Sequence, residues 1–325
     1  MVVVLAGGVG AARFLRGLCK IVAQEDITVV VNVGDDLELH GLRICPDLDS
    51  ITYWLAGLVH PEQQWGRADE HFTVSAELAR LGHEPWFTLG DRDLALHLHR
   101  TALLHDGRTL TAVTADVTRR YGLALRLLPA TDDRLETRIH TTDGRDLHFQ
   151  QWWVGERAAH DVAHVEYRGA PAARAAPGVV EAIEDADVVI VAPSNPVVSI
   201  APITAVPAIA AALASTSARI VGVSPIVGGR VVRGMAHRLL PAVGANVDAA
   251  GVATWYGARM AGGLLDAWIV DTVDTHALPA VRELGMMATA TETLMDDSRV
   301  AAALARTVLD LADSHRPDVR QGSRV

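Results

Sequence analysis

The first 33 residues carry the pattern that most restricts the fold. A short apolar run, residues 2–5, leads directly into Gly7-Gly8-Val9-Gly10, and a second apolar run covers residues 27–33. Between them, residues 13–21 place their apolar side chains at helical spacing. Apolar strands without polar alternation are typical of parallel sheets covered on both faces. This strand, helix and strand form a βαβ unit, which predicts an α/β fold with a doubly wound, mainly parallel, Rossmann-like sheet.

The rest of the chain repeats this signal with one interruption. Apolar strands are expected at residues 187–191, 219–223, 267–270 and 286–290, with helices at 207–214, 247–256, 276–284 and 298–312. The middle differs, with helices expected at 70–81 and 94–104 and a β-hairpin at 137–154 turning at Asp143-Gly144. Residues 1–60 and 178–315 are therefore predicted to form a nucleotide-binding core, 61–177 an inserted helical and β-hairpin subdomain, and 316–325 a flexible tail.

Composition excludes several classes of protein. The 325 residues include 29 Lys and Arg against 39 Asp and Glu, and the net charge of −10 argues against nucleic-acid binding. Two cysteines, Cys19 and Cys45, are too few for a disulfide framework and favour the cytoplasm. Residues 188–218 carry no charge, but four prolines interrupt them, so no membrane span is expected.

Unusual residues cluster where the predicted strands end, the edge at which parallel sheets bind ligands. The glycine loop at residues 7–10 would let a phosphate approach the backbone at a helix N-terminus. It lacks the third glycine of the dinucleotide fingerprint, since Arg13 stands there, and no GK[ST] motif exists. Because Lys20 is the one lysine, phosphate contacts are expected from backbone, arginine and Mg²⁺. The alternative is a simple glycine turn.

Acidic residues follow the second strand. Asp35, Asp36 and Glu38 come first, and Asp47 and Asp49 follow within Cys45-Pro46-Asp47-Leu48-Asp49. Carboxylates so close to a phosphate site repel it and one another, and Mg²⁺ relieves that repulsion. The alternative is that they are caps or solvated loop charges.

A second polar loop, Gly90-Asp91-Arg92-Asp93, precedes a predicted helix. Either aspartate could be an N-cap, whereas Arg92 could bind an anion or stack on a ring. His97 and His99 lack a recognisable metal-binding spacing.

Together these motifs resemble the 2-phospho-L-lactate transferase family (CofD/FbiA), which acts in coenzyme F-420 biosynthesis. The segments that carry the resemblance run in order from residue 2 to 295: LAGGVG at 5–10, VVVN at 29–32, ICPDLD at 44–49, LGDRD at 89–93, APSNP at 192–196, VSPI at 223–226 and TLM at 293–295. The resemblance implies transfer of a phosphoenolpyruvyl or 2-phospho-L-lactyl group from a guanosine diphosphate-linked donor to a ribityl hydroxyl of the deazaflavin Fo, with Mg²⁺ as cofactor and GMP released. Arginine in place of lysine suggests a GC-rich genome of the actinomycete kind and favours the enolpyruvyl donor.

The resemblance also suggests roles for individual residues. Asp49 and Arg92 would contact Fo, and Asp36 and Asp49 would bind the metal or receive the hydroxyl proton as catalytic residues. The guanosine diphosphate part would lie on residues from four loops: Gly7, Gly8, Gly10, Asn32, Ser194, Asn195, Ser224 and Gly228.

Two other functions stay open. One is an NAD(P)-dependent oxidoreductase, although Asn32 stands where an acidic residue would usually hold the ribose. The other is a non-catalytic nucleotide-binding regulator. A homodimer is expected.

Overall fold

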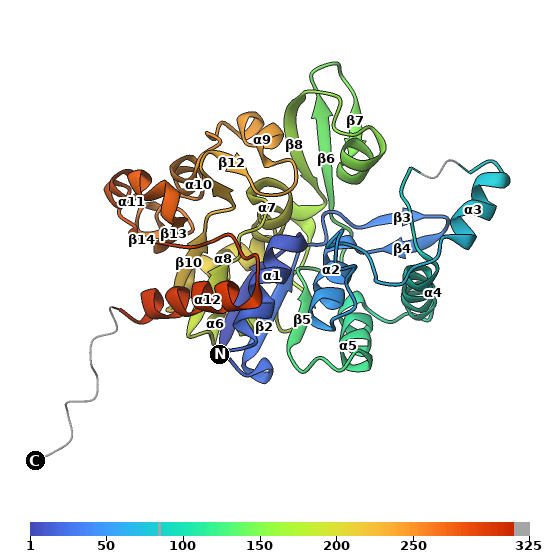
Figure 1. Cartoon of the computed structure of the whole chain (residues 1–325), viewed down its shortest axis with the longest axis horizontal. Helices are drawn as coiled ribbons and strands as arrows, with labels where there is room; N and C mark the ends of the chain where they lie inside the picture. The colour runs from blue at the N-terminus through green and yellow to red at the C-terminus, as the bar shows by residue number, and fades with distance from the viewer. Residues whose placement is uncertain (84–85, 315–325) are drawn as a thin grey trace, which may run out of the picture.

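The fold is built on a seven-stranded parallel sheet, seen in a computed structural model that describes residues 1–83 and 86–314 (Figure 1). In chain order the strands are β1 (Val2–Ala6), β2 (Ile27–Val31), β5 (Arg126–Pro129), β9 (Val188–Val191), β10 (Arg219–Val223), β13 (Ala267–Asp271) and β14 (Met287–Thr291). All five residues of β1, β2 and β13 are buried, which explains their continuous apolar sequences. The predicted α/β class and parallel sheet are confirmed.

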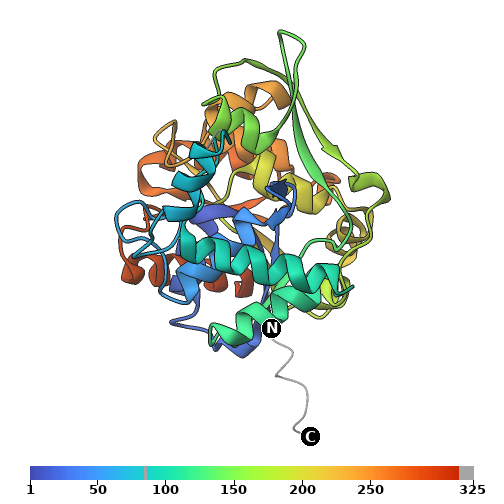
Figure 2. The same cartoon turned by 90° about the vertical axis from the view of Figure 1, so that its right-hand side faces the viewer.

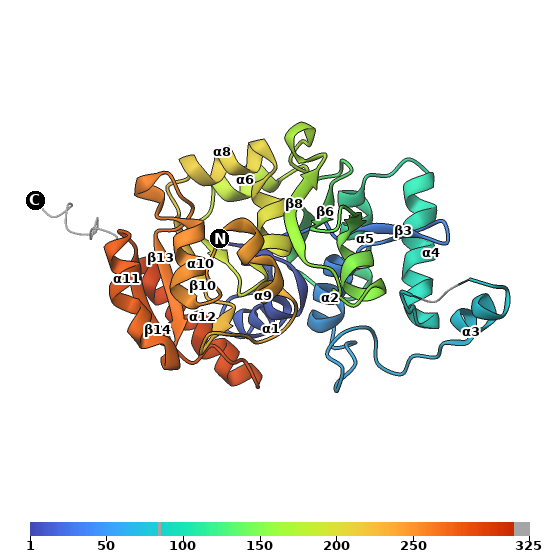
Figure 3. The ribbon, with the colours of Figure 1, turned by 90° about the horizontal axis from the view of Figure 1, so that it is seen from above.

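Strand order places a topological switch point at β1. The sheet reads β14-β13-β10-β9-β1-β2-β5, so the chain builds outward from β1 through β2 to β5 and later through β9 to β14 on the other side. Helices α1 (Gly8–Leu18) and α12 (Ser298–Asp313) lie on one face, with α6 (Val179–Glu184) and α8 (Pro207–Ser215) on the other (Figure 3). The loops after β1 and β9 therefore meet at the crevice where such sheets bind ligands.

Two smaller units flank the sheet. A three-stranded antiparallel sheet, ordered β7-β6-β8, projects from it (Figure 1) and consists of β6 (Glu136–Thr141), β7 (Asp146–His148) and β8 (Val162–Arg168). Beyond β5 lie the hairpin β3 (Leu37–Leu39) and β4 (Leu42–Ile44) and the helices α3 (Thr73–Arg80), α4 (Asp91–His105) and α5 (Leu110–Arg120) (Figures 1 and 2).

The remaining regular elements fill the connections. They are α2 (Pro46–Leu55), which packs on α1, and α7 (Ala201–Thr204), β11 (Ile226–Val227), β12 (Arg230–Val231), α9 (Ala236–Leu239), α10 (Ala249–Tyr256) and α11 (Leu278–Glu283). The predicted helices at 207–214, 247–256 and 298–312 match α8, α10 and α12 within two residues at either end.

The predicted insertion differs from the structure in two ways. Strand β5 lies within residues 61–177 yet pairs with β2, so the central sheet takes in part of that range. The hairpin turns at Asp143-Gly144 as expected, but its second strand ends at His148 and a helical turn, Gln151–Gly155, follows. Trp152 is fully buried there, whereas Trp153 is 37% exposed. The tail at 316–325 lies outside the described residues.

Within the described residues, no single helix is long and apolar enough to cross a membrane. The bent pair Pro196–Thr204 and Pro207–Ser215 passes that test only when its parts are joined across an 86° bend.

Candidate active site

The glycine loop and the loop after β9 touch at the switch point. Ser194 Oγ donates to the Gly7 carbonyl at 2.8 Å and lies 3.3 Å from the Gly7 amide nitrogen, which donates to it. A Cβ at Gly10 would stand 2.2 Å from the Pro193 carbonyl oxygen, so only glycine permits this approach. The two predicted nucleotide loops are therefore packed together. Ser194 itself is buried and bonded to Gly7.

Asn32 organises the acidic loops from the end of β2. Its side-chain amide nitrogen lies 3.1 Å from Asp35 Oδ1, 2.9 Å from Asp47 Oδ2 and 3.1 Å from the Val198 carbonyl, and its Oδ1 accepts from the Gly34 amide at 2.8 Å. The side chain is fully buried. Asn32, predicted as a nucleotide contact, is thus engaged within the protein by two carboxylates and two backbone groups.

The side chain of Asp47, which belongs to α2, lies at the N-terminus of α1. Its carboxylate accepts a hydrogen bond from the Gly8 amide, and a Cβ at Gly7 would stand 2.5 Å from Asp47 Oδ2. Burial raises the pKa of Asp47 to about 7, although the hydrogen bonds from Asn32 and Gly8 act in the opposite direction. The N-terminus of α1, predicted to face a phosphate, therefore contacts the Asp47 carboxyl group. This close contact is possible because Gly7 has no side chain.

Asp35 lies beside Asp47, and both carboxyl groups contact the Asn32 side chain. Burial, followed by the charge of Asp47, raises the pKa of Asp35 well above its usual range. Asn32 and Gln150 are its hydrogen-bond donors, with Gln150 Nε2 at 3.4 Å from Asp35 Oδ2. Among the described residues, neither Asp35 nor Asp47 forms an ion pair.

The two predicted catalytic carboxylates each have an arginine partner. Asp36 Oδ2 lies 3.0 Å from Arg43 Nη2, while Asp36 Oδ1 is buried without a hydrogen bond. Burial raises the pKa of Asp36 to about 6, against the effect of Arg43. Asp49 receives Arg100 on both oxygens, with Nη1 at 3.1 Å from Oδ2 and a closer contact from Nη2 to Oδ1. Both carboxylates and Arg100 are buried and Arg43 is partly buried, so the arginine charges compensate these carboxylates.

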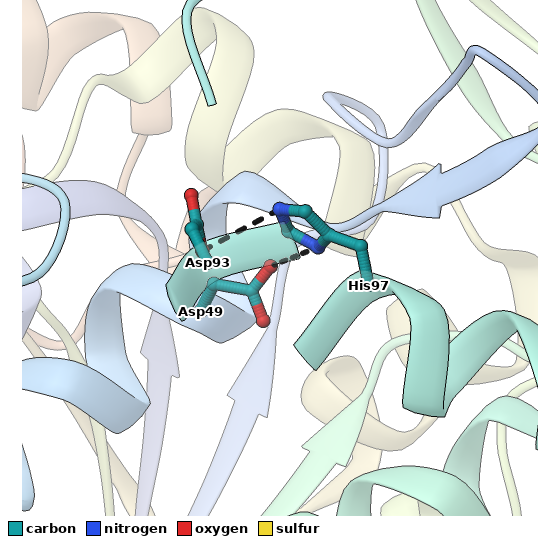
Figure 4. Close-up of side chains that lie close together, drawn as sticks. All are labelled: Asp49, Asp93 and His97. Carbon is teal, nitrogen blue, oxygen red and sulfur yellow. Dashed lines mark ion pairs between the residues drawn. The ribbon is translucent and has the colours of Figure 1, made fainter. Parts of the chain in front are cut away.

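Behind Asp49 lies a buried network that includes His97 and Asp93 (Figure 4). His97 Nδ1 lies 3.7 Å from Asp49 Oδ2 and 3.3 Å from Arg100 Nη1, and Nε2 lies 3.4 Å from Asp93 Oδ1. Tyr53 donates to Asp93 at 2.5 Å. Asp49, Asp93 and His97 are near enough to one another to share a metal ion. However, the two nitrogens of His97 face different carboxylates and Arg100 occupies Asp49, so an ion-pair network fits the geometry better.

Residues 90–93 take part in helix capping through the Asp91 side chain and two backbone amides, whereas the side chain of Arg92 does not. Asp91 accepts from the Thr73 and Val74 amides at 3.3 and 3.1 Å, so it caps α3 rather than its own helix. Glu70 caps α4 by accepting from the Arg92 and Asp93 amides, both at 2.8 Å. The Arg92 side chain is half exposed, and its nearest carboxylate is Asp69 at 4.0 Å. The Arg92 side chain is thus accessible at the surface, and its contact with Fo stays a prediction.

The other predicted nucleotide residues shape their own loops. Asn195 Oδ1 accepts from the Val197 amide at 3.0 Å, and Ser224 Oγ donates to the Ile226 carbonyl at 2.9 Å. The Gly228 amide donates to Asp274 Oδ2 at 2.9 Å, and Gly228 has a φ of +57°, which favours glycine. These residues set the path of the backbone at the sheet edge.

The charges of this site suit a bound divalent cation. When all four are ionised, Asp35, Asp36, Asp47 and Asp49 carry four negative charges, against the two positive charges of Arg43 and Arg100. A divalent cation would neutralise the remainder, and Mg²⁺ prefers such oxygen ligands. Asp36 has a buried oxygen available for it, whereas Asp49 would first have to release Arg100.

Several residues of this site were not predicted as functional from the sequence. Asp35 and Asp47 belonged to the predicted acidic cluster but were not selected as ligands. Arg43 and Arg100 were missed because their acidic partners come from other segments of the chain, and His97 was set aside because it lacks a recognisable metal-binding spacing. A motif search could have weighed Asp47 equally with Asp49, since both lie in the same six-residue segment.

Comparison with known proteins gives concordant results. The family profile of 2-phospho-L-lactate transferase CofD matches residues 2–310. A phosphoenolpyruvate transferase of Kitasatospora aureofaciens is 49% identical over 327 residues, covering 99% of each chain. One of Streptomyces griseus is 50% identical over 319 residues, covering 97% of this chain and 99% of its own.

Solved structures share the fold. A crystal structure of a upf0052 family member from Bacillus halodurans has a TM-score of 0.65 at 17% identity and covers 95% of this chain and 98% of its own. The family match and the full-length identity show that the chain belongs to the CofD 2-phospho-L-lactate transferase family, and it is a transferase.

Proposed function

We propose that this CofD family member transfers a phosphoenolpyruvyl group from a guanosine diphosphate-linked donor to Fo in coenzyme F-420 biosynthesis. The observation that carries the proposal is identity of about half the residues, over the whole chain, to proteins named phosphoenolpyruvate transferase. Those names favour the enolpyruvyl over the lactyl group. Transferase family membership argues against both an oxidoreductase and a non-catalytic regulator.

The reaction is a phosphoryl substitution. A ribityl oxygen of Fo forms a bond to the outer phosphorus of the donor, the bond from that phosphorus to the bridging oxygen breaks, and GMP leaves with that oxygen. The hydroxyl proton passes to a nearby base. Enzymes accelerate such transfers mainly through positioning and electrostatic stabilisation.

We assign the chain's residues as follows. The glycine loop and its neighbours after β9 and β10 hold the guanosine diphosphate part by backbone contacts. Arg92 and Asp49 hold Fo, with Asp49 kept in one orientation by Arg100. Asp36 or Asp47 accepts the hydroxyl proton, since burial raises the pKa of each toward neutrality, to about 6 and about 7.

Magnesium completes the proposal. Asp36, Asp35 and Asp47 would hold it, because these carboxyl groups retain oxygens that no arginine fully occupies. When bound, Mg²⁺ would screen the donor's diphosphate and stabilise negative charge on the leaving oxygen. Cytoplasmic location and a homodimer stay predictions.

The test is a product mass measurement after incubation with Fo, the enolpyruvyl donor and Mg²⁺. The expected product carries the enolpyruvyl phosphate, and the lactyl product would be two hydrogens heavier. Asp36→Asn should reduce turnover by at least about 100-fold if it serves as base. Asp310→Asn, which alters an exposed aspartate on α12, should leave turnover unchanged. An Asp36→Asn enzyme with normal turnover would refute the assignment of Asp36, and absence of any Fo adduct from the wild type would refute the function.

A further inference from the structure

A pocket lies beside α1 and is lined by residues to which the proposed reaction assigns no role. It has a volume of about 430 Å³ and lies among α1, the end of α2 and the start of α12. Figure 1 shows α1 between these two helices. Apolar groups, including Trp54, Leu55 and Met295, form part of the wall. Trp54 lies seven residues after Asp47 on α2, about 10 Å along the helix axis, so the pocket is separate from the acidic cluster.

Positive charge gathers in this pocket without carboxylate partners. Arg13 and Arg16, one helical turn apart on α1, both line it, and their guanidinium carbons lie 5.8 and 6.0 Å from the Trp54 ring centre. Among the ion pairs of the described residues, neither arginine is paired with a carboxylate. Arg233, on the loop after β12, does not line the pocket but contacts Gln64 in its wall, and burial together with the charge of Arg13 lowers the pKa of Arg233. In a chain of net charge −10, three such arginines mark a local anion preference.

Gln64 contacts two of these arginines, Arg13 and Arg233. Its Oε1 accepts from Arg13 Nη2 at 2.7 Å and lies 3.3 Å from Arg233 Nη1, while its carbonyl accepts from Trp54 Nε1 at 3.1 Å. Gln64 also has a φ of +61°, in the left-handed region that non-glycine residues rarely adopt. A strained residue held by three hydrogen bonds indicates a preorganised wall. Each guanidinium keeps further N–H donors for a ligand, because it has five.

Two carboxylates also line the pocket, and one of them serves as a helix cap. Asp297 accepts from the Arg299 and Val300 amides at 2.7 and 2.8 Å, so it caps α12, and these hydrogen bonds hold its pKa below the usual range. Asp296 is the other lining carboxylate and is exposed. Ser298 accepts from Lys20 at 2.6 Å, which brings a further positive charge to this wall.

We propose that this pocket binds an organic phosphate. Two neighbouring guanidinium groups suit a dianion, and a phosphate monoester carries nearly two negative charges at neutral pH. The apolar wall suits the organic part of the ligand, and the volume exceeds what an inorganic ion would fill. None of its lining residues is among those proposed to hold the donor or Fo.

Three probes of similar shape and different charge test this proposal by isothermal titration: phenyl phosphate, benzoate and phenol. Phenyl phosphate should bind saturably, and at least about 10-fold more tightly than benzoate, because only the dianion engages both arginines. Arg13→Gln with Arg16→Gln should weaken its binding at least about 10-fold. Arg80→Gln with Arg306→Gln removes the same net charge from exposed helix positions outside the pocket and should not weaken it.

The same titrations can refute the proposal. Equal binding of phenyl phosphate and phenol, or no saturable binding at all, would refute an anion site. Equal weakening in both double variants would show that the effect is one of net charge. Asp36→Asn should leave phenyl phosphate binding intact, which separates failure of this pocket from failure of the proposed reaction.

Discussion

Replacing Asp47 with asparagine should stabilise the protein above pH 7 and destabilise it near pH 4. Burial raises the pKa of this carboxyl group from 3.8 to about 7 in the folded state. A raised pKa means that the folded protein holds the proton to higher pH than the unfolded chain does. The carboxyl group therefore penalises folding progressively as the pH rises from about 4 to about 7, and the whole penalty remains above that range.

The magnitude follows from this difference in pKa. About three pKa units at ~1.4 kcal/mol each give at most about 4 kcal/mol of destabilisation in the ionised state. Asparagine cannot ionise, but its amide nitrogen faces a donor, either the Asn32 amide or the Gly8 amide, and that mismatch costs about 1–3 kcal/mol. The net gain at pH 8 is about 1–3 kcal/mol. Part of it arises at Asp35, whose pKa the Asp47 charge raises.

Thermal unfolding of the metal-free protein between pH 4 and pH 8 measures the effect. For a chain of 325 residues, ~2.1 cal/mol/K per residue of unfolding entropy converts about 1–3 kcal/mol into roughly 1.5–4.5 °C. The melting temperature of Asp47→Asn minus that of the wild type should be negative near pH 4 and positive near pH 8. Asp310→Asn, an exposed matched change, should show no such crossing. A difference that stays constant across this pH range would refute the reasoning, because Asp47 would then ionise normally in the folded protein.

Three further perturbations test other parts of the site. Gly10→Ala should destabilise the protein by at least about 2 kcal/mol in urea unfolding, because its Cβ would stand 2.2 Å from the Pro193 carbonyl; an unchanged midpoint would contradict the packing of the two loops. Arg100→Met should cost about 3–5 kcal/mol, since it leaves Asp49 buried without its partner, and a loss below ~1 kcal/mol would show that Asp49 is solvated. Removing Mg²⁺ with a chelator should abolish Fo turnover, and Mg²⁺ should restore it; full turnover in chelator would refute the proposed metal.

Patterns of apolar residues predicted every strand of the parallel sheet except β5. Strands β1, β2, β9 and β13 are continuous apolar runs because helices cover both faces of the sheet. Strand β5 escaped prediction because it is short, begins with Arg126 and ends with Pro129, and depends on pairing with β2 for its place. Its residues gain their strand conformation from a partner nearly 100 positions away, which local patterns do not contain.

Partners of the acidic residues were less predictable for a related reason. The motif at 44–49 indicated a functional loop, but it could not show which charges would be compensated. Asp36 and Asp49 pair with Arg43 and Arg100, and Arg100 comes from α4, 51 residues after Asp49. Only the tertiary fold determines which carboxylates acquire an arginine and which remain uncompensated.

The geometry of α2 explains why two aspartates in one motif differ so strongly. Asp47 and Asp49 are two residues apart on a helix, so their side chains point about 200° apart around its axis. Asp47 therefore faces α1 and the Gly8 amide, whereas Asp49 faces α4 and Arg100. The first stays uncompensated beside the glycine loop, where protons and a divalent cation would compete for it, and the second is held rigidly by a permanent cation. A single short helix thus presents one carboxyl group with a raised pKa and another that is paired with an arginine. If Asp47 is part of the cation site, Mg²⁺ should raise the melting temperature of the wild type at pH 8 but much less at pH 5, where the proton already occupies the site.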